Sequence, residues 1–125
     1  ELFDFSYHVR ERIEAMVDRV LPAGGTWPDA LFVSSDALAM MILDILNARG
    51  IRVPEDVAMI GLGDLFMSDH SGIGLSTVRE PTEELGRQAA EAIFALIKKP
   101  EQGPIQKVIE CDELLVRRTT QSSGT

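Results

Sequence analysis

The chain has 125 residues, which is the size of one domain or of part of one. Its 45% hydrophobic content is enough for a core, whereas a net charge of −8 with scattered Lys and Arg argues against direct nucleic-acid binding. No apolar run reaches the ~18 residues that span a bilayer, and the N-terminus lacks signal-peptide form. The single Cys111 rules out an internal disulfide and is typical of a reducing compartment, so we expect a soluble, cytoplasmic protein.

Hydrophobic residues first recur at helical spacing and then form a short continuous run. The spacing predicts a helix over 6–20, with Ser6 as its N-cap. The apolar run at 30–34 is typical of a strand buried on both faces of a parallel sheet. Asp36 is predicted to start a second helix, which Gly50 ends as its C′ residue.

The remaining pattern continues the alternation of strands and helices. A second buried strand is predicted at 57–61. The later elements are expected in this order: a loop at 62–76, a helix at 83–98, strands at 107–111 and 113–118, and a mobile tail at 121–125. Strands that alternate with helices indicate parallel βαβ units, so the predicted fold class is α/β.

Polar residues follow the two predicted buried strands. Ser35 and Asp36 come after the first strand, and Gly63 and Asp64 come after the second. In an open parallel sheet, ligands bind outside the carboxyl ends of the strands. The sequence therefore predicts that these residues converge on one small molecule, as in a ligand-sensing lobe.

Patterns typical of enzymes are weaker than this one. A Gly-x-Gly pair follows the second strand, but Phe66 stands where a dinucleotide fingerprint needs its third glycine. The Ser34-Ser35 pair lacks the Gly-x-Ser-x-Gly elbow of hydrolases. His8 and His70 have no metal-ligand spacing and are expected to be solvated or capped. We therefore predict no enzyme, no metal and no cofactor.

Five short motifs occur in a fixed order along the chain. They are Pro28-Asp29-Ala30 leading to Ser35-Asp36 and Ala39, the run from Gly50 to Val57, Gly61-x-x-Asp64, Thr77-Val78-Arg79, and Gly86-x-x-Ala89. With the ending Leu114-Leu115-Val116-Arg117-Arg118, they resemble the C-terminal part of LacI/GalR-type transcription regulators over residues 3–120. The resemblance implies a Rossmann-like, parallel-sheet lobe of a periplasmic-binding-protein type I fold. That fold would be truncated, since the first lobe and the helix-turn-helix domain are not in the chain, which begins with Glu1 rather than Met.

The resemblance also implies a division of the chain. Residues 1–79 would form the C-terminal lobe, 80–99 the helix that crosses to the N-terminal lobe, 105–120 the returning strands, and 121–125 the tail, with crossovers near 76–80 and 100–105. Family dimers pack through this lobe, which implies a homodimer interface on helix 37–49 and loop 66–74. Met40 and Phe66 would anchor that interface, or would otherwise be core residues.

The resemblance further suggests ligand roles for the strand-end residues. Phe5 would be a wall of the pocket that packs on a sugar face, or else an ordinary core aromatic. Ser35 stands where sugar-responsive members often have Asn, and Asp36 is expected to cap its helix rather than touch ligand. Gly63 stands where sugar-binding members usually have Asp, which disfavours a neutral sugar. Together with Asp64, this combination resembles gluconate-operon repressors, so a sugar acid such as gluconate is the predicted effector.

Two other functions fit the same fold. Extracytoplasmic sugar-binding proteins differ from the regulators in a region upstream of this chain, although the Arg-Val-Pro-Glu-Asp and Thr-Val-Arg segments favour a regulator. A plain oligomerisation module is compatible with either. In the regulator, operator DNA would be contacted only through the absent helix-turn-helix domain, and no membrane partner is expected.

Helix 83–98 poses a physical problem if the first lobe is absent. It carries an apolar stripe made of Leu85, Ala89, Ile93, Leu96 and Ile97. Leaving the large members of this stripe in water forfeits about 1.5–3 kcal/mol apiece. We therefore expect the helix to fold onto its own lobe or onto a second copy of the chain.

Overall fold

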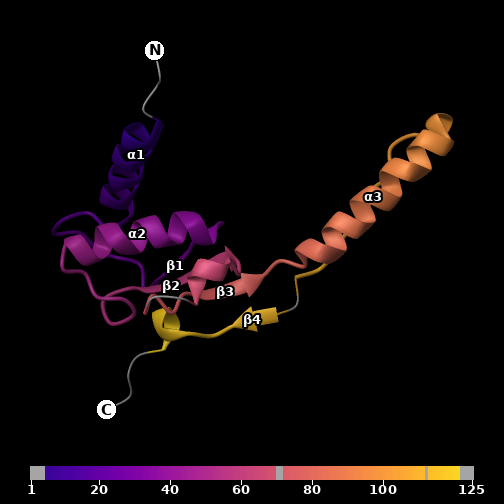
Figure 1. The fold of residues 1–125 in the computed structure, drawn as a ribbon. Helices are drawn as coiled ribbons and strands as arrows, with labels where there is room; N and C mark the ends of the chain where they lie inside the picture. The colour runs from indigo at the N-terminus through magenta and orange to yellow at the C-terminus, as the bar shows by residue number, and fades with distance from the viewer. Residues whose placement is uncertain (1–4, 70–71, 112, 122–125) are drawn as a thin grey trace.

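The computed structural model describes residues 5–69, 72–111 and 113–121, with side chains from Val9 onward (Figure 1). The helices and strands follow in this order: α1 (Phe5–Val20), β1 (Ala30–Phe32), α2 (Asp36–Ala48), β2 (Ala58–Gly63), β3 (Ser76–Arg79), α3 (Thr82–Lys98) and β4 (Glu113–Leu115). Three single-turn 3-10 helices are η1 (Phe66–Ser68), η2 (Pro100–Gln102) and η3 (Arg118–Thr120). None of the described helices is both long and apolar enough to cross a bilayer.

One four-stranded sheet organises the molecule, in the order β1-β2-β3-β4. The first three strands are parallel and β4 runs antiparallel to β3, which confirms the predicted α/β class with a mostly parallel sheet. β3 is an inner strand, although a loop and a crossover were expected over these residues. Its first two residues, Ser76 and Thr77, are polar and fully buried, so they lack the apolar run that marks a buried strand in a sequence.

The hydrophobic core lies where α1, α2 and β2 meet. Its members come mostly from the two helices, and α2 packs against both α1 and β2. The buried apolar residues are Ile13, Val17, Leu21, Val33, Ala39, Ile42, Leu43, Ile45, Leu46, Val53, Val57, Met59 and Leu75. The prediction that 30–34 is buried on both faces is wrong for β1. Phe32 is 64% exposed, because β1 is the outermost strand of the sheet among the described residues.

The ends of the first two helices only partly follow the predictions. Gly50 ends α2 as expected: it has φ +72, and its N–H donates to the Asn47 carbonyl while the Ile51 N–H donates to that of Leu46. This pair of bonds is a Schellman motif, which glycine favours at the left-handed position. The predicted N-cap, Ser6, lies inside α1, because the helix already includes Phe5.

Two predictions at the C-terminal end are also corrected. Residues 107–111 form no strand, because no neighbouring strand pairs with them among the described residues, and Val108 is 91% exposed. The last strand is shorter than the predicted 113–118, since the chain turns into η3 at Arg118. The predicted tail lies outside the described residues from position 122 onward.

Helix α3 projects away from the rest of the molecule (Figure 1). None of its residues is buried, and Phe94 and Ile97 are 64% and 68% exposed. The expectation that the helix folds onto its own lobe is therefore wrong in this structure. Packing against a second copy stays a prediction.

Candidate functional site

The carboxyl ends of the parallel strands β1 and β2 lie at the same end of the sheet, which is its carboxyl edge. Phe32 is the register partner of Ile60, and the Val33 N–H donates to the Ile60 carbonyl at 2.8 Å. Ser35 and Gly63 each follow three residues after this matched pair, so both lie near the carboxyl ends of their strands, Gly63 as the last residue of β2 and Ser35 beyond the end of β1. Ser35 is partly buried and occupies the N-cap position of α2 without a capping side-chain hydrogen bond.

Asp36 connects this edge to the loop after β2 and to β3. Its carboxylate is fully buried, and Oδ1 accepts a hydrogen bond from the Thr77 hydroxyl at 2.7 Å. Oδ2 accepts hydrogen bonds from the Ser68 hydroxyl at 2.6 Å and from the Leu65 N–H at 3.0 Å. The prediction that Asp36 caps its own helix is therefore wrong: the side chain bonds to other elements. Gly61 is required beside it, because a Cβ there would lie 2.1 Å from Oδ1.

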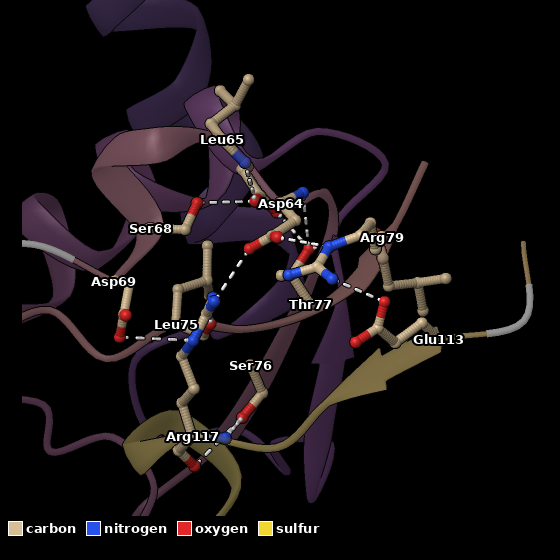
Figure 2. Close-up of polar contacts among 12 residues, drawn as sticks. Asp64, Leu65, Ser68, Asp69, Leu75, Ser76, Thr77, Arg79, Glu113 and Arg117 are labelled. Atoms are coloured by element: carbon tan, nitrogen blue, oxygen red, sulfur yellow. Dashed lines mark hydrogen bonds and ion pairs between the residues drawn. The ribbon is translucent and has the colours of Figure 1, made fainter. Parts of the chain in front are cut away.

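Asp64 is held by two arginines, as Figure 2 shows. Its Oδ2 lies 2.8 Å from Arg79 Nε, and its Oδ1 lies 2.8 Å from Arg117 Nη2. Burial alone raises the pKa of Asp64, but the hydrogen bonds from Arg117 and Arg79 outweigh burial, so the pKa falls below its ordinary value. Arg79 also pairs with Glu113 at 2.6 Å. The Asp64 carboxylate thus ties the end of β2 to β3 and to the C-terminal segment.

Gly63 faces a carboxylate that the sequence analysis missed. Gly63 is the register partner of Arg79, so Glu80 is the first residue beyond β3 at this edge. A Cβ on Gly63 would lie 3.6 Å from Glu80 Oε2. The signal that could have found Glu80 is the rule that ligand residues follow strand ends. That rule could be applied here only by recognising residues 76–79 as a strand.

In the part of the chain that the structure describes, hollows lie near several of these residues. An apolar hollow of about 220 Å³ lies among α1, β1 and α2, with Phe32 and Ser34 in its lining. A shallow hollow of about 480 Å³ lies where β3 leads into α3 and includes Arg79 and Glu80. A third, of about 290 Å³, is lined by Asp64, Leu65, Phe66, Asp69, Arg79 and Arg117.

The structure places the other predicted site residues as follows. Phe5 is the first residue of α1, and its side chain lies outside the described part, as do the side chains of His8 and His70. Met40 is partly buried and packs against the core, whereas Phe66 is 77% exposed on η1. Within the described ranges, no group of three or more His, Cys, Asp or Glu residues could hold a metal ion.

Residues 4–120 match a family model described as a periplasmic binding protein-like domain. The chain is 36% identical over 98 residues to the probable HTH-type transcriptional repressor ExuR of Bacillus subtilis. It is 32% identical over 94 residues to the arabinose metabolism transcriptional repressor of Geobacillus stearothermophilus. These matches cover 78% and 75% of the chain but only 29% and 26% of the two repressors.

The solved structures that resemble this chain include transcriptional regulators as well. A LacI-type regulator from Bacillus cereus subsp. cytotoxis aligns with a TM-score of 0.77 and 25% identity, over 92% of this chain and 40% of that one. The regulator CelR in complex with cellobiose aligns with a TM-score of 0.72 and 32% identity, over 88% of this chain and 32% of that one. The chain thus spans between about a quarter and two fifths of the proteins it matches.

Proposed function

Because the chain belongs to the family of periplasmic-binding-protein-like domains, we propose that it is part of the effector-binding domain of a LacI-type transcriptional regulator. The expected resemblance to that class is confirmed, since the relatives named above are transcriptional repressors and LacI regulators. These names describe regulators rather than enzymes. The complete regulator would bind operator DNA through a domain outside this chain, in the cytoplasm.

One observation carries the proposal. The ends of three parallel strands place Ser35, Gly63 and Glu80 at a single edge of the sheet, where ligands bind in open α/β folds. The hydrogen bonds of Asp36 and the ion pairs of Asp64 link the loop after β2 to α2 and to β3. The loops that carry these residues are therefore held in place. A preorganised edge of this kind suits a binding site better than a flexible loop does.

The effector that we propose is a small sugar or a sugar acid such as gluconate. Structural relatives include complexes with cellobiose and, at 28% identity and a TM-score of 0.66, with lactose, which supports a sugar. Gly63 brings no negative charge of its own, which supports a sugar acid. Ser35, Gly63 and Asp64 would border the ligand or shape its site, and Phe5 would pack on its apolar face.

The proposed mechanism is allosteric. Effector binding would close the cleft between the two lobes and rotate them about the connections into and out of helix 80–99. A homodimer formed through α2 and the loop 66–74 would pass this rotation to the DNA-binding domains. Met40 and Phe66 are the proposed anchors of that interface.

An extracytoplasmic sugar-binding protein is the second candidate, because it has the same fold. The repressor names of the relatives favour the regulator. Fluorescence anisotropy with operator DNA and the complete natural protein separates the two. For a regulator, an effector sugar changes operator affinity about 5- to 150-fold. Sugar binding without any operator binding would instead identify a binding protein, and a plain oligomerisation module would bind neither.

A further inference from the structure

Arg79 stands where the chain leaves the sheet toward α3. It is the last residue of β3, and its register partner is Glu113, the first residue of β4, which follows α3 in the chain. The outgoing and returning segments of α3 therefore meet the sheet side by side at these two residues, and α3 projects beyond them (Figure 1). A rotation of α3 against the body would change how the two segments lie against each other.

One guanidinium links these two segments to the carboxyl edge of the sheet. Arg79 Nη1 lies 2.6 Å from Glu113 Oε2, and Arg79 Nε lies 2.8 Å from Asp64 Oδ2, as Figure 2 shows. Asp64 directly follows Gly63, the last residue of β2. The Arg79 side chain thus joins the start of the outgoing segment to the end of the returning one and to the neighbour of a proposed ligand residue.

The two carboxylates hold Arg79 unequally. Asp64 is mostly buried, and a second arginine, Arg117, donates to its other carboxylate oxygen at 2.8 Å. Arg79 and Glu113 are both about half-exposed, and an exposed ion pair contributes little to stability because water competes for both charges. The contact with Asp64 is therefore the fixed one, whereas the contact with Glu113 can open when the segments move.

The backbone at Asp64 is in an uncommon conformation. Gly63 and Asp64 have φ +129 and +53, and a positive φ is rare in a residue that carries a side chain. Such a conformation persists where the surrounding contacts hold it. Arg79 and Arg117 supply those contacts at Asp64, so a displacement of Gly63 by a bound ligand is passed to the Arg79 side chain.

We propose that Arg79 is a positioning residue that couples effector binding to the movement of α3, by releasing Glu113 while it stays bound to Asp64. The intact Arg79–Glu113 pair links the outgoing and returning segments, as in this structure. A ligand at the carboxyl edge shifts Asp64 and Arg79 together, which opens the pair and frees the segments to rotate. This pair is then the contact that differs between the two states of the regulator. The inference rests on the proposed function and names the side chain through which an effector would act.

Operator binding by the complete natural protein tests this coupling. Fluorescence anisotropy uses DNA from upstream of the protein's own gene, and the effector probes are arabinose, cellobiose, lactose and gluconate. Each probe is first titrated by calorimetry without DNA. A probe that acts as an effector should change the DNA Kd of the wild type about 5- to 150-fold.

Glu113→Gln removes the charge that holds the returning segment. Without any sugar, the DNA Kd of this variant should shift about two- to fivefold toward that of the sugar-saturated wild type, which is the strength of an exposed ion pair. The variant should also bind the sugar about two- to fivefold more tightly, because the ligand no longer has to open the pair. A loss of local structure would not tighten sugar binding.

Two further variants sharpen the test. Arg79→Lys keeps the charge, but an ammonium lacks the planar fork that holds two carboxylates, so it should act like Glu113→Gln, and the double variant should add little. Glu110→Gln is the matched control, because Glu110 is exposed three residues before Glu113 and forms no hydrogen bond or ion pair within the described ranges. It should change each Kd less than about twofold. Unchanged thermal unfolding shows that the variants fold.

The outcomes separate this inference from the proposed function. If Glu113→Gln leaves both Kd values as in the wild type, or weakens sugar binding, the coupling role of Arg79 is overturned while the sensor function stands. An equal effect of Glu110→Gln also overturns it, since any lost charge would then suffice. If none of the four probes binds the wild type or changes its DNA affinity, the proposed function fails, and the coupling role fails with it.

Discussion

The body of the molecule and helix α3 are built from similar amphipathic patterns but differ in what covers them. In the body, α2 buries six residues, among them Ile42 and Leu46, against α1 and the sheet. In α3 no residue is buried, although its apolar stripe is just as regular. The comparison teaches that periodicity specifies a helix and its apolar face, whereas the partner of that face is specified elsewhere.

The two regions also differ in how their charges are used. In the body, Asp36 and Asp64 bond to groups far away in sequence and hold separate elements together. In α3 the charged contacts are mostly local, with Arg87 pairing to Glu84 and to Glu91 within one turn. Local pairs stabilise a helix by a few tenths of a kcal/mol but do not position it.

The largest expected effect comes from truncating matched apolar residues in the two regions. Leu46→Ala removes a fully buried side chain of α2 and should lower the free energy of unfolding by about 2–5 kcal/mol. Ile97→Ala in α3 should change it by less than about 0.5 kcal/mol in this 125-residue chain. Urea unfolding measures both. If Ile97→Ala lowered the free energy of unfolding by more than about 2 kcal/mol, α3 would be covered in solution. The contrast between a buried α2 and an uncovered α3 would then be wrong.

The next effect concerns the buried carboxylate. Asp36→Ala leaves the Ser68 and Thr77 hydroxyls and the Leu65 N–H without their acceptor, so we expect a loss of about 2–4 kcal/mol. Asp44→Ala, on the exposed face of the same helix, is the control and should cost less than about 1 kcal/mol. Chemical denaturation should show this difference clearly. Equal costs would show that Asp36 is not a connecting residue.

A smaller effect is expected where the backbone approaches this carboxylate. Gly61→Ala places a Cβ 2.1 Å from Asp36 Oδ1, so the carboxylate or the strand must shift, at a cost of about 1–3 kcal/mol. Gly86→Ala on α3 meets nothing within 4 Å and should stabilise the helix slightly. Thermal unfolding of the two variants should therefore move in opposite directions. Similar shifts would contradict the close approach at Gly61.

The smallest effect is a pH dependence within α3. Hydrogen bonds from Arg87 and then Gln88 lower the pKa of Glu84 to about 2, from an ordinary 4.5. A lowered pKa in the folded state means that the contribution is present above the unfolded pKa and is lost as the pH falls toward 2. NMR titration of the Glu84 carboxyl carbon should show this midpoint. Arg87→Gln should return the midpoint toward 4.5, and an unchanged midpoint would remove Arg87 as the cause.

Much of the fold could be predicted from hydrophobic pattern alone. The helix that Gly50 ends, the strand at β2 and helix α3 all follow from apolar spacing and stop residues. β3 was not predicted as a strand, because its buried residues are polar and form tertiary hydrogen bonds. For example, the Ser76 N–H donates to the Thr119 hydroxyl, 43 residues away. Segment 107–111 has a strand-like pattern but no described neighbour to pair with, and strands need neighbours.

The candidate site shows the same limit. Ser35 and Gly63 follow from strand ends, which a sequence displays directly. The ion pairs of Asp64 depend on residues brought together by the register of three strands, and the position of Glu80 depends on a strand that the pattern hides. The hydrophobic pattern therefore indicates where two of the strands end, but not which carboxylates gather beside those ends.

The Thr119 side chain has a consequence for how this polypeptide is made. Its hydroxyl donates to the Met59 carbonyl on β2 and accepts from the Ser76 N–H on β3, so it bridges two inner strands that are synthesised long before it. While the ribosome is still translating the α3 codons, the Met59 carbonyl and the Ser76 N–H do not yet have the Thr119 hydroxyl as their hydrogen-bond partner. A premature stop codon just ahead of residue 119 would therefore release a product that quality-control proteases should recognise, although almost every helix and strand would already be present.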